Sequence, residues 1–217
     1  MKREVDIDEI SDGRRYHAGD MVKISCNDCK GCSKCCHDMG DSIILDPYDI
    51  YQLTLGLGMS FEALMSGDAP YVELAMADGI MLPHISMNNK RKSCRLLSDE
   101  GRCRIHDFRP GFCRMFPLGR VYENGSFSYF NQVYECDYPV KSKIKVKKWI
   151  GIPNIAEYEK FALAWHDYLI DVRQAVSDAE DISTAKAIMY GLIKRFYVDA
   201  YDPARPIYDQ IEERMKL

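Results

Sequence analysis

The feature that most constrains this chain is a run of five cysteines within eleven residues near its start. Cys26, Cys29, Cys32, Cys35 and Cys36 stand in the segment Cys-Asn-Asp-Cys-Lys-Gly-Cys-Ser-Lys-Cys-Cys. Thiolates with two residues between them can point to one side of a tight loop, and that arrangement is typical of metal and iron–sulfur sites. The sequence therefore predicts a metal site in this loop.

Four more cysteines follow one at a time, and the whole set favours metal binding over disulfides. They are Cys94, Cys103, Cys113 and Cys136. The first residues are charged and include no apolar stretch of the kind that a secretory signal needs, so we expect a cytoplasmic protein. Thiols stay reduced in that compartment, where clustered cysteines bind metals or take part in redox chemistry.

Composition and charge argue against two classes of partner. Hydrophobic residues make up 47% and charged residues 29% of the chain, as is usual in soluble globular proteins. No stretch approaches the roughly 20 apolar residues that span a membrane. The formal net charge of −4 argues against nucleic-acid binding across the whole surface. We therefore expect neither a membrane nor a nucleic acid as a partner.

One local exception to the acidic balance is residues 141–148, which hold five lysines. Lysines alternate there with other residues, a pattern typical of an edge strand or linker whose lysines are solvated and discourage further strand pairing. A docking patch for an acidic partner is the alternative interpretation.

Turn and cap signals predict an α+β fold whose cysteine-rich body has short hairpins and short helices. An Asp-Pro start predicts a helix over residues 46–56, and a serine cap predicts another over 60–65. Asp-Gly and Asn-Gly turns predict hairpins over 71–87 and 118–134. We also expect a strand at 42–45.

Two further short features are expected between these hairpins. Two apolar runs flank a turn within residues 94–105. A short helix that carries Cys113 should begin at Arg109-Pro110.

The last third of the chain has the apolar spacing of helices. We expect helices over residues 154–178, 182–198 and 205–216. We expect one domain over residues 1–217, with a cysteine-rich body at about 20–140 and an all-helical part at about 145–217, because the apolar helix faces need something to cover.

Two ligand sets fit the first cysteine cluster by spacing. Cys26, Cys29, Cys32 and Cys36 match the C-x2-C-x2-C-x3-C spacing of bacterial ferredoxins, although His37 stands where a proline usually follows. Cys29, Cys32, Cys35 and Cys36 instead give C-x2-C-x2-C-C. Neighbouring side chains diverge, so an adjacent pair is better placed to serve two metal centres, or two irons of a larger cluster, than one tetrahedral ion.

The second of these sets, taken with the later cysteines, resembles the YkgJ-type cysteine-cluster family. The first box is Cys29-Lys-Gly-Cys-Ser-Lys-Cys-Cys36, and the second is Arg102-Cys-Arg-Ile-His-Asp-Phe-Arg-Pro-Gly-Phe-Cys-Arg-Met-Phe-Pro117. The resemblance covers about residues 26–140. The family is described as a zinc- or iron-chelating domain and includes flagellin lysine N-methylases.

The resemblance implies eight metal ligands, enough for two centres of four thiolates each. They are Cys29, Cys32, Cys35, Cys36, Cys94, Cys103, Cys113 and Cys136. We expect two [4Fe-4S] clusters, with zinc as the alternative. Cys26 is additional to the family pattern.

Charged residues beside the cysteines have two interpretations each. Arg109 and Arg114 either donate hydrogen bonds to cluster sulfurs or form structural salt bridges. His37 and His106 are either ligands or residues that orient the ligands.

Two other sequence motifs are missing. The chain has no phosphate-binding glycine loop, and Met39 stands where the three-cysteine C-x3-C-x2-C pattern of radical enzymes needs its last cysteine.

The leading functional hypothesis is a cytoplasmic iron–sulfur protein that transfers electrons or supports a modification reaction. A structural zinc-binding protein is the first alternative, and a lysine N-methylase-like enzyme is the second. Enzymatic activity is left open between an iron–sulfur oxidoreductase and a protein-lysine methylase. The expected partner is a redox protein or a protein substrate.

Overall fold

The computed structural model describes residues 6–26, 32–88, 90–136, 138 and 140–216, and it confirms the α+β class. The helices are α1 (Ile7–Ile10), α2 (Pro47–Leu57), α3 (Phe61–Leu64), α4 (Gly111–Met115), α5 (Val146–Ile150), α6 (Ile155–Ser177), α7 (Ile182–Ile193) and α8 (Ile207–Met215). The strands are β1 (Met21–Ser25), β2 (Val72–Ala77), β3 (Ile80–Ile85), β4 (Met87–Asn88), β5 (Ser93–Cys94), β6 (Leu118–Glu123), β7 (Ser126–Asn131) and β8 (Ser142–Lys145). The strands pair as β1–β8, β2–β3, β4–β5 and β6–β7, each pair antiparallel.

Helices α2 and α3 begin where their cap signals predict. The Asp46 carboxylate accepts a hydrogen bond from the Asp49 amide, and the Asp49 carboxylate accepts one from the Asp46 amide, which completes a capping box. Gly58 ends α2 in a left-handed conformation that costs glycine little. The Ser60 hydroxyl accepts from the Ala63 amide at the start of α3.

Both predicted hairpins are confirmed. β2 and β3 pair from Val72–Ile85 to Ala77–Ile80 around a tight turn. β6 and β7 pair around Asn124-Gly125, where both residues take the positive φ that this turn requires. β7 ends at Asn131, three residues before the predicted limit.

One strand prediction is wrong. Residues 42–45 form no strand, since Ile44 makes only an isolated bridge to His84, a residue that local sequence does not identify as its partner. The turn predicted within residues 94–105 is confirmed, because the two runs meet in antiparallel orientation at the Leu97–Cys103 bridge, while Cys94 pairs with Met87 of β4.

The lysine-rich run divides into two elements. Its first part is β8, which pairs with β1 so that Lys143 lies opposite Lys23. The next residues form α5. Lys143 and Lys145 are exposed, as expected for an edge strand with solvated lysines.

The C-terminal third is helical, as predicted. Helix α6 covers almost all of 154–178, and α8 lies within 205–216. The predicted helix over 182–198 is α7 followed by a π-helical turn, Lys194–Val198. None of the helices in the described part of the chain combines the length and apolar character that crossing a bilayer requires.

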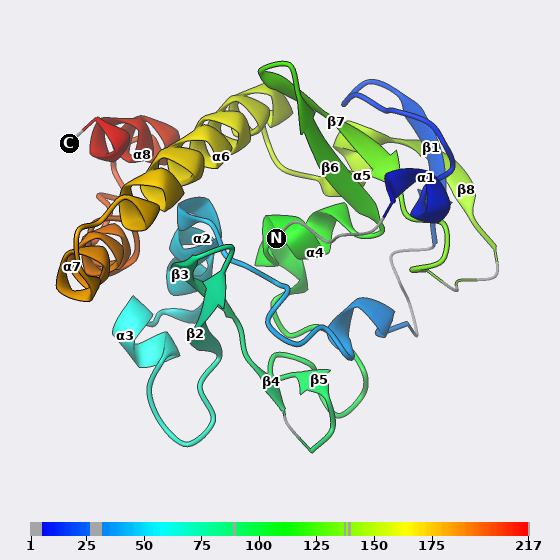
Figure 1. The fold of residues 1–217 in the computed structure, drawn as a ribbon. Coiled ribbons are helices and arrows are strands. Elements are labelled where there is room, and N and C mark those ends of the chain that lie inside the picture. The colour runs from blue at the N-terminus through cyan, green and yellow to red at the C-terminus, as the bar shows by residue number, and fades with distance from the viewer. Residues whose placement is uncertain (1–5, 27–31, 89, 137, 139, 217) are drawn as a thin grey trace.

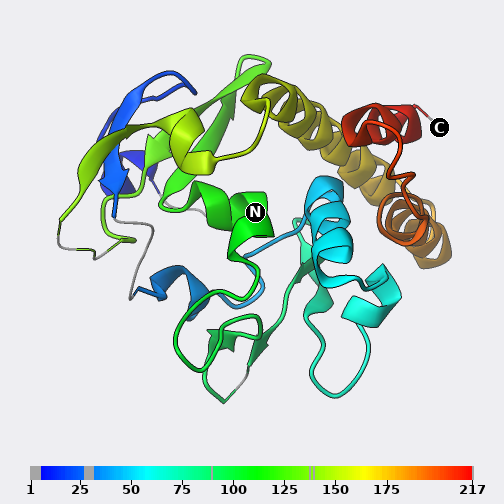
Figure 2. The same ribbon diagram turned by 180° about the vertical axis from the view of Figure 1, so that it is seen from behind.

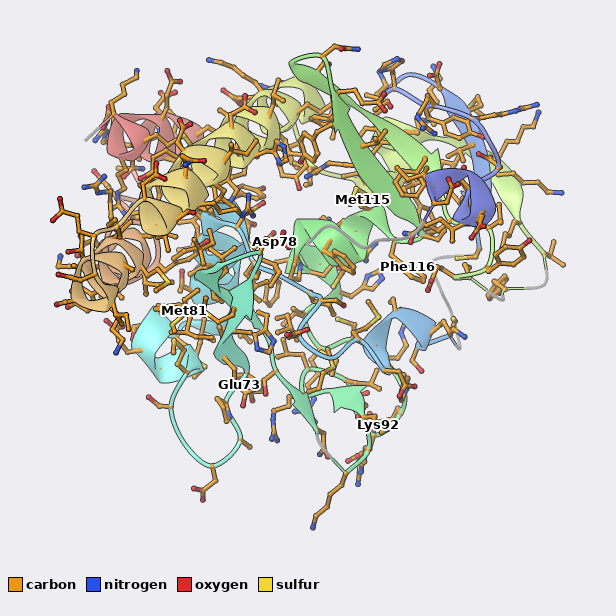
Figure 3. All side chains as sticks on the ribbon, in the orientation of Figure 1. Glu73, Asp78, Met81, Lys92, Met115 and Phe116 are labelled. Carbon is orange, nitrogen blue, oxygen red and sulfur yellow. The ribbon has the colours of Figure 1, made fainter. Side chains whose placement is uncertain are left out.

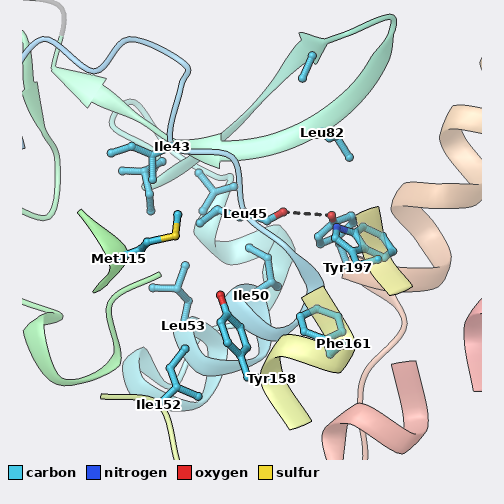
Figure 4. Packing of buried hydrophobic residues seen from close by; sticks show 14 of the residues in the cluster. Ile43, Leu45, Ile50, Leu53, Leu82, Met115, Ile152, Tyr158, Phe161 and Tyr197 are labelled. Carbon is cyan, nitrogen blue, oxygen red and sulfur yellow. Dashed lines mark hydrogen bonds between the residues drawn. The ribbon is translucent and has the colours of Figure 1, made fainter. Parts of the chain in front are cut away.

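The elements gather at two ends of the molecule with α4 between them (Figures 1 and 2). Helices α2, α3, α6, α7 and α8 lie with the β2–β3 hairpin at one end, and the β1–β8 and β6–β7 pairs lie at the other. Figure 4 shows the core where the helical part meets the body. There the buried Tyr197 hydroxyl donates a hydrogen bond to the Leu45 carbonyl at 3.1 Å.

Candidate metal centre

Cysteines that are far apart in the sequence line one cavity. These are Cys32, Cys35, Cys36, Cys94, Cys103 and Cys113. Its apolar wall includes Ile43, Ile85, Leu96 and Ile105, and its basic side includes Arg102, His106 and Arg109. The structure thus brings together six of the eight predicted ligands around a largely apolar space.

Short elements hold these thiols in place. Cys35 and Cys36 lie on a 3-10 turn, Lys34–Cys36, and the His37 backbone after it bridges Ser93 beside Cys94. Cys113 lies on α4, as predicted from Arg109-Pro110.

Helix α4 is fixed at both of its ends. At its start, a Cβ on Gly111 would collide with the Tyr158 hydroxyl of α6, so only glycine allows this approach. At its end, the Trp149 indole of α5 donates to the Phe116 carbonyl at 3.0 Å. Figure 3 labels Phe116 beside Met115 there, and both Phe116 and Trp149 line the cavity.

The adjacent cysteines act as a hydrogen-bonded pair. The Cys36 thiol donates to Cys35, and this bond, helped by the Arg109 charge, lowers the pKa of Cys35 to about 7. The same bond, with burial and the other thiols, raises the pKa of Cys36. About half of the Cys35 side chains are therefore thiolate near pH 7, the form of cysteine that binds metals.

Two other cavity thiols favour the neutral form. Burial, with a smaller contribution from neighbouring cysteines, raises the pKa of Cys94 to about 11 and that of Cys113 well above its usual range. A group of thiols that oppose one another's ionisation is a site where a cation would be strongly favoured, because a metal ion draws off their protons.

The basic residues of the second box bind protein atoms. The Nη1 of Arg109 donates both to the His106 ring at 2.5 Å and to the His106 carbonyl at 3.1 Å. Arg114 donates to the carbonyls of Arg109 and Asp107. These bonds hold the ligand-bearing segment in place, a role that the sequence analysis offered for His106 but not for the two arginines. The His37 ring hydrogen-bonds to the Ser33 hydroxyl at 3.3 Å.

A buried carboxylate that contacts the start of α4 was missed by the sequence analysis. Asp49, 3% exposed, accepts a hydrogen bond from the Gly111 amide at 2.7 Å. Burial raises the pKa of Asp49 to about 6, although the hydrogen bonds from Gly111 and Asp46 lower it. The Asp-Pro cap signal marked the turn of α2 that holds Asp49. Nothing in the neighbouring sequence indicates that Asp49 contacts Gly111, which is 62 positions away.

Cys29 lies outside the described residues. Among the residues that are described, Cys26 and Cys136 do not line the cavity. Within the same set, no three His, Cys, Asp or Glu side chains have the spacing of a metal-ion site. The complete ligand set therefore stays a prediction, while the chemistry of the donors, buried thiols from several segments, fits a soft metal or an iron–sulfur cluster.

A comparison with protein-family models matches residues 28–136 to the CxxCxxCC family, whose description is "Putative zinc- or iron-chelating domain". The match takes in half of the chain and every cysteine except Cys26. Comparisons with curated proteins and with solved structures found no match. The family description supports a metal-binding role for the cysteine cluster.

Proposed function

The chain belongs to the CxxCxxCC family, and from that premise we propose that it is an iron–sulfur protein whose cysteines hold two clusters for electron transfer. The single observation that carries this proposal is the cavity lined by six cysteines. Thiolates are the usual ligands of iron–sulfur clusters, four to a cluster. The eight cysteines of the family pattern suit two such clusters.

The walls of the cavity support a redox role. Leu96, Ile105 and Phe116 keep water from one side of the thiols, and Arg109 places a positive charge near Cys35. Solvent exclusion and nearby charge are the means by which proteins set the potential of an iron–sulfur cluster. When bound, such a cluster supplies reversible one-electron chemistry.

Two alternatives remain as outcomes of the test. A structural zinc protein would use the same thiols, since four cysteines are also a common zinc ligand set. A lysine N-methylase-like enzyme would need a place for a methyl donor. The redox proposal is preferred because an adjacent, hydrogen-bonded cysteine pair suits a multi-iron cluster better than a tetrahedral ion.

A redox titration tests the proposal. The full chain, purified without oxygen, is titrated with dithionite and a mild oxidant while visible and electron paramagnetic resonance spectra are recorded. Reversible bleaching and a paramagnetic signal in the reduced protein are expected. A colourless protein with tightly bound zinc and no signal would replace this function with the structural one. Saturable binding of S-adenosylmethionine to such a protein would favour the methylase.

A further inference from the structure

The outer face of the β1–β8 pair is basic. Val22 and Ile24 of β1 point into the core, each 1% exposed, so the alternate residues of the strand point outward. The strand register places Lys23 directly opposite Lys143, and Lys145 follows two residues later on the same face of β8. All three lysines are exposed.

Helix α5 extends this basic region beyond the two strands. It directly follows β8, and its exposed residues include Lys147 and Lys148. The Lys147 amide donates to the Ala18 carbonyl at 2.9 Å, which fastens the start of α5 to the segment before β1. Figure 1 shows α5 at the same end of the molecule as β1 and β8. The basic surface is defined here as Lys23, Lys143, Lys145, Lys147 and Lys148.

Nothing in the described part of the chain neutralises the basic surface. The ion pairs among the described residues involve other side chains, and none includes a member of this surface. Asp20, three residues before Lys23, uses its carboxylate to accept a hydrogen bond from the His17 amide at 2.7 Å. Five lysines without a described carboxylate partner therefore lie together on a chain whose net charge is −4.

Protection of a strand edge accounts for only part of this pattern. Lysines on β8 discourage further strand pairing, but Lys147 and Lys148 lie on a helix, which has no edge to protect. Like charges directly opposite each other on neighbouring strands, as at Lys23 and Lys143, are destabilising. A basic surface that costs stability, and that edge protection does not require, indicates a role in binding.

The basic surface adjoins the cysteine cavity. Trp149 directly follows Lys148 and lines the cavity, and its indole donates to the carbonyl of Phe116, another lining residue. A protein docked on α5 therefore lies one residue along the chain from the cavity wall.

The charge distribution of the chain favours a partner whose negative charge is local. A nucleic acid or an anionic membrane presents negative charge over a long distance, and the acidic remainder of this chain would repel it. An acidic patch on a protein can face the basic surface alone, and complementary charges speed such encounters. The small area of the basic surface also suits electron-transfer complexes, whose interfaces are small and weak.

We propose that the basic surface docks an acidic one-electron carrier protein, which exchanges electrons with a cluster in the cysteine cavity. The electron step rests on the proposed function: the reduced cluster loses one electron, and the oxidised carrier gains it. The docking step depends only on the lysines and on the carboxylates of the carrier.

Two forms of one carrier test the charge requirement. Cytochrome c is a basic one-electron carrier, and its succinylated form has carboxylates in place of lysine ammonium groups. The reduced full-length chain is mixed with each ferric form, and haem reduction is followed by stopped flow as the ionic strength is raised. The rate with the succinylated form should fall as salt screens the attraction. A rate with this form that rises or stays constant would overturn the inference.

Matched variants locate the docking site. Lys143→Glu is compared with Lys186→Glu, which changes an exposed lysine of α7 and alters the net charge equally. Lys143→Glu should fold normally, because it places opposite charges across the strands at Lys23. At low salt it should slow reduction of the succinylated form by about threefold or more, while Lys186→Glu changes the rate little. Equal effects of the two variants would show that only net charge matters and would overturn the inference.

Binding without electron transfer separates this inference from the function beneath it. Sedimentation of ferric succinylated cytochrome c with the oxidised full-length chain at low salt measures docking alone. Binding that Lys143→Glu weakens, with no haem reduction by the reduced wild-type chain, would support the docking surface and overturn the proposed electron transfer. Haem reduction without detectable binding, or tighter binding of a DNA duplex or of phosphatidylserine vesicles, would overturn the docking surface and leave the proposed function intact.

Discussion

Asp49 links the thiol-bearing helix to the rest of the protein. Its carboxylate accepts from the Gly111 amide at the start of α4 and from the Asp46 amide at the start of α2. Close by, Arg120 donates to the Tyr158 hydroxyl at 2.8 Å, and that hydroxyl packs against Gly111. The position of Cys113 thus depends on a buried polar group that is no ligand, in the way that outer residues orient metal ligands elsewhere.

Burial of Asp49 predicts a pH-dependent stability. Its pKa is about 6 in the folded protein against 3.8 for the free side chain, so the folded state binds the proton more tightly. The free energy of unfolding therefore falls as pH rises from about 4 to about 6, by about 3 kcal/mol for this group. Asp49→Asn removes the titration. The free energy of unfolding of the variant, minus that of wild type, should be about 3 kcal/mol larger at pH 7 than at pH 4.

Urea unfolding of both proteins across this pH range provides the measurement. A difference between the variant and wild type that does not change with pH would show that burial does not raise the pKa of Asp49.

At the scale of elements, the sequence predicted correctly the helix start and the hairpin turn that contacts within a few residues determine. The Asp46 cap and the Asn124-Gly125 turn act within a few residues, and the elements that they predict are present. The strand predicted at residues 42–45 is absent, because the backbone of this segment meets His84, which is distant in sequence, at a single isolated bridge. The cavity could be predicted as a set of cysteines by family resemblance, whereas its wall and Asp49 depend on tertiary contacts.

The hydrogen bond between Tyr197 and Leu45 predicts how firmly the helical part is attached to the body. Tyr197→Phe leaves the buried Leu45 carbonyl without its 3.1 Å donor, so we expect a loss of about 1–2 kcal/mol in the free energy of unfolding. Tyr190→Phe on α7 is the matched control, since that side chain is 69% exposed and should change stability little. Chemical denaturation of both variants measures the effect. Equal stabilities would contradict this role for the Tyr197 hydroxyl.

Over the whole molecule, a helical scaffold and a thiol-bearing region differ in what stabilises them. Helix α6 buries Tyr158, Phe161 and Trp165 in apolar packing. The thiol-bearing segments are short turns and two-residue strands around a cavity, so a bound metal would supply much of their order. We expect the two regions to be parts of one domain, because Met115 of the cysteine-bearing helix α4 and Tyr158 of α6 belong to the same core, shown in Figure 4.

Removal of the metal should therefore loosen one region more than the other. Hydrogen exchange after chelation is expected to speed up in residues 32–36 and 93–115 and to change little in α6. The midpoint of thermal unfolding should fall by about 10–20 °C if metal binding contributes about 5 kcal/mol. Equal acceleration of exchange throughout the chain would show instead that the metal stabilises the fold as a whole.

The central claim is that the cysteine cavity holds a metal centre, and the content of iron, sulfide and zinc in the wild-type chain tests it most directly. Protein purified without oxygen is analysed beside Cys103→Ser, which removes one cavity thiol. The account predicts about eight irons and a matching amount of sulfide per wild-type chain, and about half as much in the variant. Well-folded wild-type protein with neither iron nor zinc, or a variant that keeps the full wild-type content, would contradict it.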